Sequence, residues 1–132
     1  MAPIRILLIE SAAADSLAIR LALSAGGSES CLLTYAHNLD AALQRLARGT
    51  VDIILIDPAL PGSPGLPAIR KIREAAPATP IFALLDIREK EPSRLALECG
   101  AQDFFLKGRF DGSALRSTLR YAAERSRRAA GR

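Results

Sequence analysis

Five short apolar runs alternate with segments of helical periodicity, and this alternation limits the possible folds of the chain more than any other feature. The runs are rich in β-branched residues and predict strands, whereas the segments between them place apolar residues at helical spacing. The predicted strands are Ile4–Ile9, Cys31–Ala36, Val51–Ile56, Pro80–Leu85 and Phe104–Leu106. Strands that alternate with helices indicate a parallel sheet covered on both faces, with right-handed crossovers. We therefore expect an α/β protein with a doubly wound, five-stranded parallel sheet and five helices.

Local signals predict where the helices begin and end. The N-terminal signals are Asp15, Asn38, Pro67 in a first helical turn and, for the last helix, Asp111 or Ser113. The first helix, which stops at Gly26-Gly27, has the apolar positions Leu17, Ile19, Leu21 and Leu23. The fourth helix is predicted over residues 88–99, where Pro92 either kinks it or delays its start. The last helix is expected to run past Arg125.

Length and composition limit the domain organisation and the compartment. A chain of 132 residues suits one domain, and we expect that domain over residues 1–126, followed by a basic tail over 127–132. No apolar run approaches the roughly 18 residues that a membrane span needs, and the N-terminus lacks the pattern of a signal peptide. Cys31 and Cys99 form neither a disulfide framework nor a metal-binding spacing. They are predicted to be small buried residues in a reducing compartment, the cytoplasm.

Positive charge is concentrated near the C-terminus. Residues 107–132 carry a net charge of +6, whereas the other 106 residues carry −2. Arginine forks suit the phosphates of a nucleotide or nucleic acid. The alternative is a solvated helix face, because Arg120–Glu124 and Glu124–Arg128 have the spacing of ordinary helical ion pairs. Since the basic character rests on one helix and aromatic residues make up only 5% of the chain, we expect neither a nucleic-acid platform nor a membrane partner.

Charged residues follow four of the predicted strands, among them Asp86 after the fourth. Functional groups of a doubly wound sheet gather outside the carboxyl ends of its strands. There Glu10 and Ser11 follow the first strand, Asp57 follows the third and Lys107 follows the fifth. Carboxylates can hold a divalent cation, and a lysine can neutralise a phosphoryl oxygen. The alternative is structural, since strands end at the surface, where acids are common, and an Asp57–Lys107 ion pair would stabilise the fold without phosphate chemistry.

Three stretches resemble the receiver domain of bacterial two-component response regulators, of the kind found in chemotaxis. They are I-R-I-L-L-I-E, V-D-I-I-L-I-D-P-A-L-P-G-S-P-G-L and G-A-Q-D-F-F-L-K-G, and the resemblance covers about Ile4 to Arg125. It implies a flavodoxin-like sheet with strand order 2-1-3-4-5 and a signalling domain that is not an enzyme. It also implies a sensor histidine kinase or phosphotransfer protein as phosphate donor, and a protein partner or an output domain that reads the signal.

The resemblance also implies roles for individual residues. Asp57 corresponds to the aspartate that accepts a phosphoryl group, and Lys107 to the lysine that contacts this group. The implied Mg²⁺ ligands are Glu10, Ser11, Asp57 and the backbone carbonyl of Ala59. Phe104 stands where an aromatic residue changes its rotamer during switching.

The acidic pocket departs from the family pattern at three positions. Ser11 replaces a carboxylate, which predicts weak binding of Mg²⁺ because this ion prefers charged oxygen ligands. Leu85 replaces the hydroxyl residue that normally turns toward the phosphoryl group, and leucine has no donor. Asp86 replaces a small residue and places a negative charge near the phosphate position. These departures predict a pseudo-receiver with impaired phosphorylation.

Three functions are compatible with this sequence. The leading hypothesis is an atypical receiver that acts by protein–protein interaction, and the first alternative is a working Mg²⁺-dependent phosphoacceptor at Asp57. The second alternative is nucleotide or nucleic-acid binding through the arginine-rich C-terminal helix. The expected interface, for a partner or a homodimer, is the face of the fourth helix, fifth strand and fifth helix, with Arg116, Arg120 and Tyr121.

Overall fold

The fold is a parallel sheet between two layers of helices. A computed structural model describes residues 3–25, 31–60, 65–86, 92–108 and 111–130. Its elements are β1 Ile4–Ile9, α1 Ala13–Ser24, β2 Cys31–Ala36, α2 Leu39–Ala47, β3 Ile53–Ile56, α3 Pro67–Ala75, β4 Ile81–Leu85, α4 Pro92–Glu98, β5 Asp103–Leu106 and α5 Gly112–Ala130. The strand order is β2-β1-β3-β4-β5, with all neighbours parallel, which confirms the predicted doubly wound sheet.

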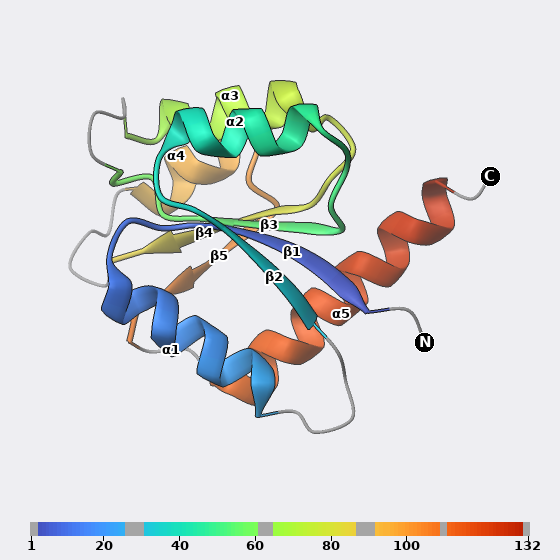
Figure 1. The fold of residues 1–132 in the computed structure, drawn as a ribbon. Coiled ribbons are helices and arrows are strands. Elements are labelled where there is room, and N and C mark those ends of the chain that lie inside the picture. Colours follow the sequence, from blue (N-terminus) through green and yellow to red (C-terminus); the bar gives the residue numbers. More distant parts are fainter. Residues whose placement is uncertain (1–2, 26–30, 61–64, 87–91, 109–110, 131–132) are drawn as a thin grey trace.

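Two apolar clusters hold the helices against the sheet. Figure 1 shows α2, α3 and α4 on one face of the sheet and α1 and α5 on the other. Alternate residues of the strands supply the two clusters, so that Ile54 and Ile56 face α2, α3 and α4, whereas Ile53 and Leu55 face α1 and α5. All four are fully buried. Burial on both faces explains why this stretch is almost continuously apolar in sequence.

The predicted helix caps are confirmed in two cases and wrong in one. The Asn38 side chain accepts a hydrogen bond of 2.8 Å from the Ala41 N–H, and Asp111 accepts one of 2.9 Å from the Ser113 N–H at the start of α5. Asp15, in contrast, is not a cap. Helix α1 begins at Ala13 after the N-cap residue Ala12, so Asp15 lies inside the first turn. Its carboxylate is therefore available for other contacts.

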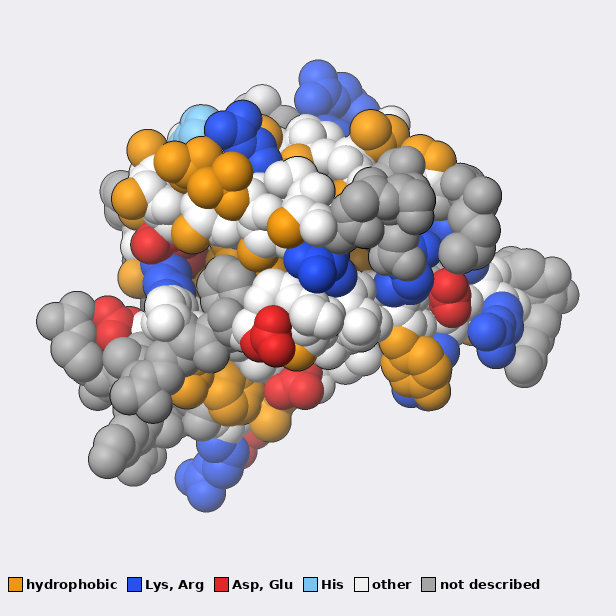
Figure 2. Space-filling view, turned by 90° about the horizontal axis from the view of Figure 1, so that it is seen from below, with side chains coloured by type: hydrophobic (Ala, Val, Ile, Leu, Met, Phe, Trp, Pro, Cys, Tyr) orange, Lys and Arg blue, Asp and Glu red, His pale blue; other side chains and the backbone are white. Residues whose placement is uncertain are grey.

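The four apolar positions of α1 are divided between the core and the surface. Ile19 and Leu23 are buried, but Leu17 and Leu21 are 45% and 57% exposed. Leu17 lies on the surface beside β2, in a shallow depression that Tyr35 and His37 also line. Figure 2 shows hydrophobic side chains gathered beside the single histidine on this side of the molecule. Four apolar positions spaced by two cannot all lie on one helical face, because successive positions are turned by about 200°.

Two strands are shorter than predicted. Strand β3 begins at Ile53, directly after Asp52, whose carboxylate accepts the Arg5 N–H at 2.8 Å. Strand β4 begins at Ile81, after Pro80, which has no N–H to donate. Helix α4 is described from Pro92 onward, so whether Pro92 kinks the helix or delays its start stays a prediction. The predicted stop at Gly26-Gly27 and residues 88–91 lie outside the described residues.

An arginine on α5 ties the end of this helix to the amino edge of the sheet. Arg127 Nη2 donates to Asp52 Oδ2 at 2.7 Å and to the Pro3 carbonyl at 2.8 Å. The hydrogen bonds and charges of Arg127 and Arg5 outweigh the effect of burial and hold the pKa of the Asp52 carboxyl below its ordinary value. Helix α5 continues to Ala130 and so includes residues 127–130, which we had assigned to a tail.

A second arginine joins three backbone segments on the other face of the sheet. The Arg73 guanidinium, on α3, donates to the carbonyls of Ala76, Pro77, Thr79 and Gly100 at 2.7–3.3 Å. Gly100 has a φ of +118°, and a Cβ there would lie 3.1 Å from Arg73 Cγ. Glycine is therefore required both for the backbone conformation and for the close approach of Arg73.

The cysteines and the apolar character of the helices were also subjects of prediction. Cys31 and Cys99 are both thiols and are only partly buried, so the prediction that both are buried is wrong in degree. Within the described residues, no helix combines the length and apolar character that crossing a membrane would require.

Candidate functional site

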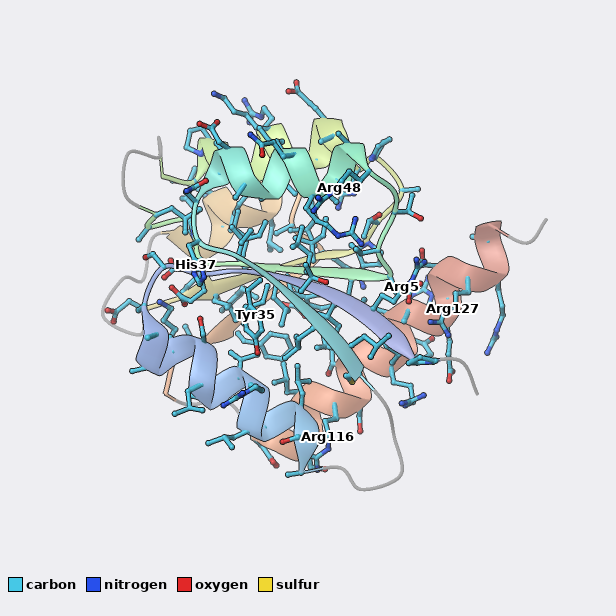
Figure 3. All side chains as sticks on the ribbon, viewed as in Figure 1. Arg5, Tyr35, His37, Arg48, Arg116 and Arg127 are labelled. Atoms are coloured by element: carbon cyan, nitrogen blue, oxygen red, sulfur yellow. The ribbon has the colours of Figure 1, made fainter. Side chains whose placement is uncertain are left out.

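Three charged residues are fixed just beyond the carboxyl ends of the strands. The N–H of Glu10 donates to the Ala36 carbonyl at 3.0 Å, that of Asp57 to the Ile9 carbonyl at 2.9 Å and that of Lys107 to the Leu85 carbonyl at 2.8 Å. Each of these bonds continues the hydrogen-bond ladder of a strand by one residue. The backbone of Glu10, Asp57 and Lys107 is therefore held in place by the sheet. In Figure 3, His37 marks this carboxyl edge, whereas Arg5 and Arg127 lie at the opposite edge.

The Lys107 ammonium lies among three carboxylates. Its Nζ is 3.1 Å from Glu10 Oε1 and 2.9 Å from Asp15 Oδ2, and it also forms an ion pair with Asp57 Oδ2. Although burial lowers the pKa of Lys107, its hydrogen bonds to Asp57 and Asp15 and its ion pair with Glu10 raise it above the ordinary value. The surrounding carboxylates therefore favour the charged form of the lysine.

Glu10 is the most buried charged residue of the site, with 1% of its surface exposed. Its Oε2 accepts the N–H groups of Ser11 and Ala12 at 3.1 and 3.3 Å. Burial, followed by the charge of Asp57, raises the pKa of the Glu10 carboxyl to about 7 despite the nearby lysine. One ammonium thus does not fully compensate the carboxylates around it.

The three carboxylates have the geometry and chemistry that a divalent cation requires. One oxygen from each of Glu10, Asp15 and Asp57 lies within 4.8 Å of the other two. Hard cations such as Mg²⁺ prefer carboxylate oxygens and retain several waters. The donor set therefore fits Mg²⁺.

Asp15 was not among the predicted site residues, because this residue was predicted to be a helix cap. Asp15 lies four residues after Ser11, which is about one helical turn. An acid one turn into the helix that follows β1 faces the same sheet edge as the end of β1. This spacing was the available signal.

The other predicted pocket residues lie around the carboxylates but differ in their surroundings. Ser11 is exposed, and Ala59 donates its N–H to Asp57 Oδ1 at 2.9 Å, a contact that fixes the carboxylate. Leu85 is 2% exposed and belongs to the apolar cluster under α2, α3 and α4, against which the half-buried Phe104 also packs. Asp86 is partly buried just after β4. The roles proposed for these residues stay predictions.

The three predicted interface residues do not share one environment. Tyr121 is 62% exposed, and the guanidinium of Arg125 lies 5.6 Å from its ring centre. Arg116, however, points to α1, where its Nη1 donates to the Ala22 carbonyl at 2.6 Å. Placing Arg116 on the face of α4, β5 and α5 is therefore wrong, because this arginine caps the end of α1. Arg120 is partly buried and has an interaction of its own.

Comparison with known proteins agrees with this geometry. The chain matches the family described as response regulator receiver domain over residues 6–120. No curated protein matches it. Among solved structures, it is similar to the signal receiver domain of an HD domain-containing protein from Pseudomonas fluorescens, with 24% identity, a TM-score of 0.86 and coverage of 100% of this chain and 95% of that one.

Two further structures are similar. The receiver domain of the sensor histidine kinase PA1611 from Pseudomonas aeruginosa, solved with a magnesium ion coordinated in its active site cleft, has 27% identity and a TM-score of 0.78, with coverage of 93% and 99%. A CheY-like response regulator receiver domain protein from Methanospirillum hungatei has 17% identity and a TM-score of 0.81, with coverage of 97% and 99%.

Proposed function

The chain belongs to the response regulator receiver domain family of two-component signalling, and we propose that it is an atypical member that works through protein–protein contacts. In this proposal the pocket around Asp57 is retained, but its coupling to the rest of the domain is impaired. Receiver domains are generally signalling modules without catalytic turnover of their own, and we propose the same for this chain.

The observation that carries the proposal is the burial of Leu85 at the end of β4. This side chain is 2% exposed and belongs to the apolar cluster, together with residues of α2, α3 and α4. A receiver of the usual pattern has a hydroxyl here, which turns toward the phosphoryl group and draws its loop inward. Leucine has no donor and would leave its apolar surroundings by such a movement, at a cost of about 2 kcal/mol for a leucine side chain.

The surroundings of Asp57 also disfavour a second negative charge. Glu10 and Asp15 already share the single Lys107 ammonium with Asp57. Asp86 adds another carboxyl group to the loop after β4. A phosphoryl group on Asp57 would replace the single negative charge of the carboxylate by about two, and this increase needs a cation to neutralise it.

A working phosphoacceptor is the second candidate, and the carboxylate cluster is the observation in its favour. Asp57, Glu10 and Asp15 form a set that fits Mg²⁺. The similar PA1611 receiver domain holds magnesium in its active site cleft. A sensor histidine kinase or a phosphotransfer protein would then be the partner, and Lys107 would contact the transferred group.

The two candidates predict different responses to beryllofluoride, which mimics a phosphoryl group on aspartate. We expect the mimic, added with Mg²⁺, to leave the amide resonances of Phe104 and of residues 92–98 within about one line width of their positions. Restoring the hydroxyl with Leu85→Thr is expected to produce clear shifts at the same residues. Two-dimensional NMR of both proteins is the measurement, and Asp57→Asn is the control for binding elsewhere. Large shifts at Phe104 in the unmodified protein would establish a working switch and contradict the proposal.

The proposed contact surface is the face formed by α4, β5 and α5, without Arg116. On it Tyr121 is 62% exposed, and Leu95 and Leu97 of α4 are 45% and 43% exposed. Aromatic and arginine side chains of this kind are common at the centres of interfaces. The surface would bind a protein partner, an output domain or a second copy of the chain.

We expect the double variant Tyr121→Ala, Arg120→Glu to lower self-association or partner binding at least tenfold while the domain stays folded. Such losses are typical when an aromatic centre of an interface is removed. Sizing by light scattering and a binding assay with the candidate partner are the measurements. Lys71→Glu on α3, which changes an exposed charge elsewhere, is the matched control. Unchanged association in the double variant would place the interface on another face.

Binding of a nucleotide or nucleic acid through α5 has less support. Arg127 is engaged with Asp52 and Pro3, and Arg116 with Ala22. Arg125 lies over the ring of Tyr121. Because these arginines already have partners within the domain, a phosphate would compete with existing contacts.

A further inference from the structure

The site on the carboxyl edge has more negative than positive charge among its closest groups. Three carboxylates, from Glu10, Asp15 and Asp57, surround one ammonium, that of Lys107. When all four are ionised, the group has a net charge of −2. This is the charge that one divalent cation neutralises.

One buried carboxylate oxygen of this cluster, Glu10 Oε1, lacks a hydrogen-bond donor among the described residues. Within the part of the chain that the structure describes, Glu10 Oε1 accepts no well-directed hydrogen bond, and its ion-pair partner is the shared Lys107 Nζ at 3.1 Å. Glu10 is 1% exposed. A buried acceptor without a full partner costs about 1–3 kcal/mol, so a ligand that reaches it is stabilised.

A small cavity lies beside the same groups. It has a volume of about 30 Å³ and is lined by Glu10, Asp15 and Lys107 together with apolar residues of α1 and β4. This is room for a single water or ion and not for an organic ligand. The Asp15 side chain is 42% exposed and is therefore on the solvent side of the cavity, where a hydrated ion would enter.

We propose that Asp15, one turn into α1, is the third carboxylate of a divalent-cation site in place of Ser11, and that the Lys107 ammonium occupies this site when no cation is bound. The cation and the ammonium then compete for the same oxygens. Asp15 can serve because α1 starts at Ala13, which places its first turn over the end of β1. The inference is independent of phosphate on Asp57 and concerns cation binding alone.

The proposal predicts opposite effects of two substitutions on cation affinity. Asp15→Asn removes a charged ligand and is expected to weaken binding of Mn²⁺ or Mg²⁺ at least tenfold, whereas Asp15→Glu keeps a carboxylate and is expected to retain most of the affinity. Lys107→Met removes the competing cation and is expected to strengthen binding about tenfold or more. Ser11→Ala is expected to change the affinity by less than twofold.

The experiment is a titration of the metal-free full chain with Mn²⁺, followed by electron paramagnetic resonance, and with Mg²⁺, followed by calorimetry. No phosphate donor is present, so failure of this inference and failure of the proposed function are distinguishable. Asp40→Asn, which removes an exposed acid on α2, is the charge-matched control. Circular dichroism verifies the fold of each variant, and Asp15→Ser replaces Asp15→Asn if the latter is unfolded. Equal affinities of the Asp15 variant and the unmodified chain, or weaker binding by Lys107→Met, would overturn the proposal.

Discussion

Replacement of Arg73 by methionine is expected to lower the free energy of unfolding by about 3 kcal/mol, corresponding to a fall in Tm of about 10 °C. The guanidinium donates to carbonyls at the end of α3, in the turn before β4 and at Gly100 after α4. Methionine keeps much of the apolar stem but donates nothing, so several partly buried carbonyls lose their partner at once. Hydrogen bonds from charged donors contribute about 1.5–3 kcal/mol each, and water replaces some of those that are lost.

Urea unfolding followed by circular dichroism measures this effect. Lys71→Met on the same helix removes an exposed positive charge and is expected to change stability by less than about 0.5 kcal/mol. If the Arg73 and Lys71 variants were equally stable, the hydrogen bonds of Arg73 to the three segments would contribute nothing to the free energy of unfolding.

Replacement of Glu10 by glutamine is expected to change how stability depends on pH. Burial and the charge of Asp57 raise the pKa of Glu10 from 4.5 to about 7 in the folded protein. The folded state therefore binds a proton more tightly than the unfolded state, and stability from this group is present below pH 4.5 and lost as pH rises to 7. The loss is on the order of 3 kcal/mol, because each unit of pKa corresponds to about 1.4 kcal/mol.

Glutamine cannot ionise. The free energy of unfolding of the variant, relative to that of the unmodified protein, is therefore expected to rise by this amount between pH 4.5 and pH 8. The measurement is the free energy of unfolding in urea across this range, with a chelator present to exclude divalent cations. Glu74→Gln, which changes an exposed acid on α3, is the control and should follow the unmodified curve. Parallel curves for the Glu10 variant and the unmodified protein would contradict the raised pKa.

The sheet was predictable because burial of its strands, which stabilises them, is also what makes their sequences apolar. Residues 53–56 are apolar without interruption since β3 is buried on both faces, and no other element explains such a run in a chain of this length. Asn38 was predictable as a cap because its side chain satisfies a local N–H, a contact that needs no knowledge of the rest of the fold.

The features that the sequence did not reveal depend on contacts between distant elements. Whether Asp15 caps α1 or faces Lys107 depends on the exact start of the helix and on β5, 92 residues away. Arg116 was assigned to a surface because its spacing says nothing about the Ala22 carbonyl that it reaches on α1. In the pocket, Glu10, Asp57 and Lys107 were predictable together because the carboxyl ends of parallel strands meet at one edge.

The contact between Arg127 and the first strand has a consequence for synthesis. The Pro3 carbonyl and Asp52 receive their guanidinium from a residue made 124 positions after Pro3. Leu115 and Leu119 of α5 likewise complete the apolar cluster of Ile4 and Ile6. A nascent chain that has not yet emerged as far as α5 thus has only α1 to cover this face of β1, β3 and β4, and the part of the face that α5 packs against stays exposed until the last helix is made.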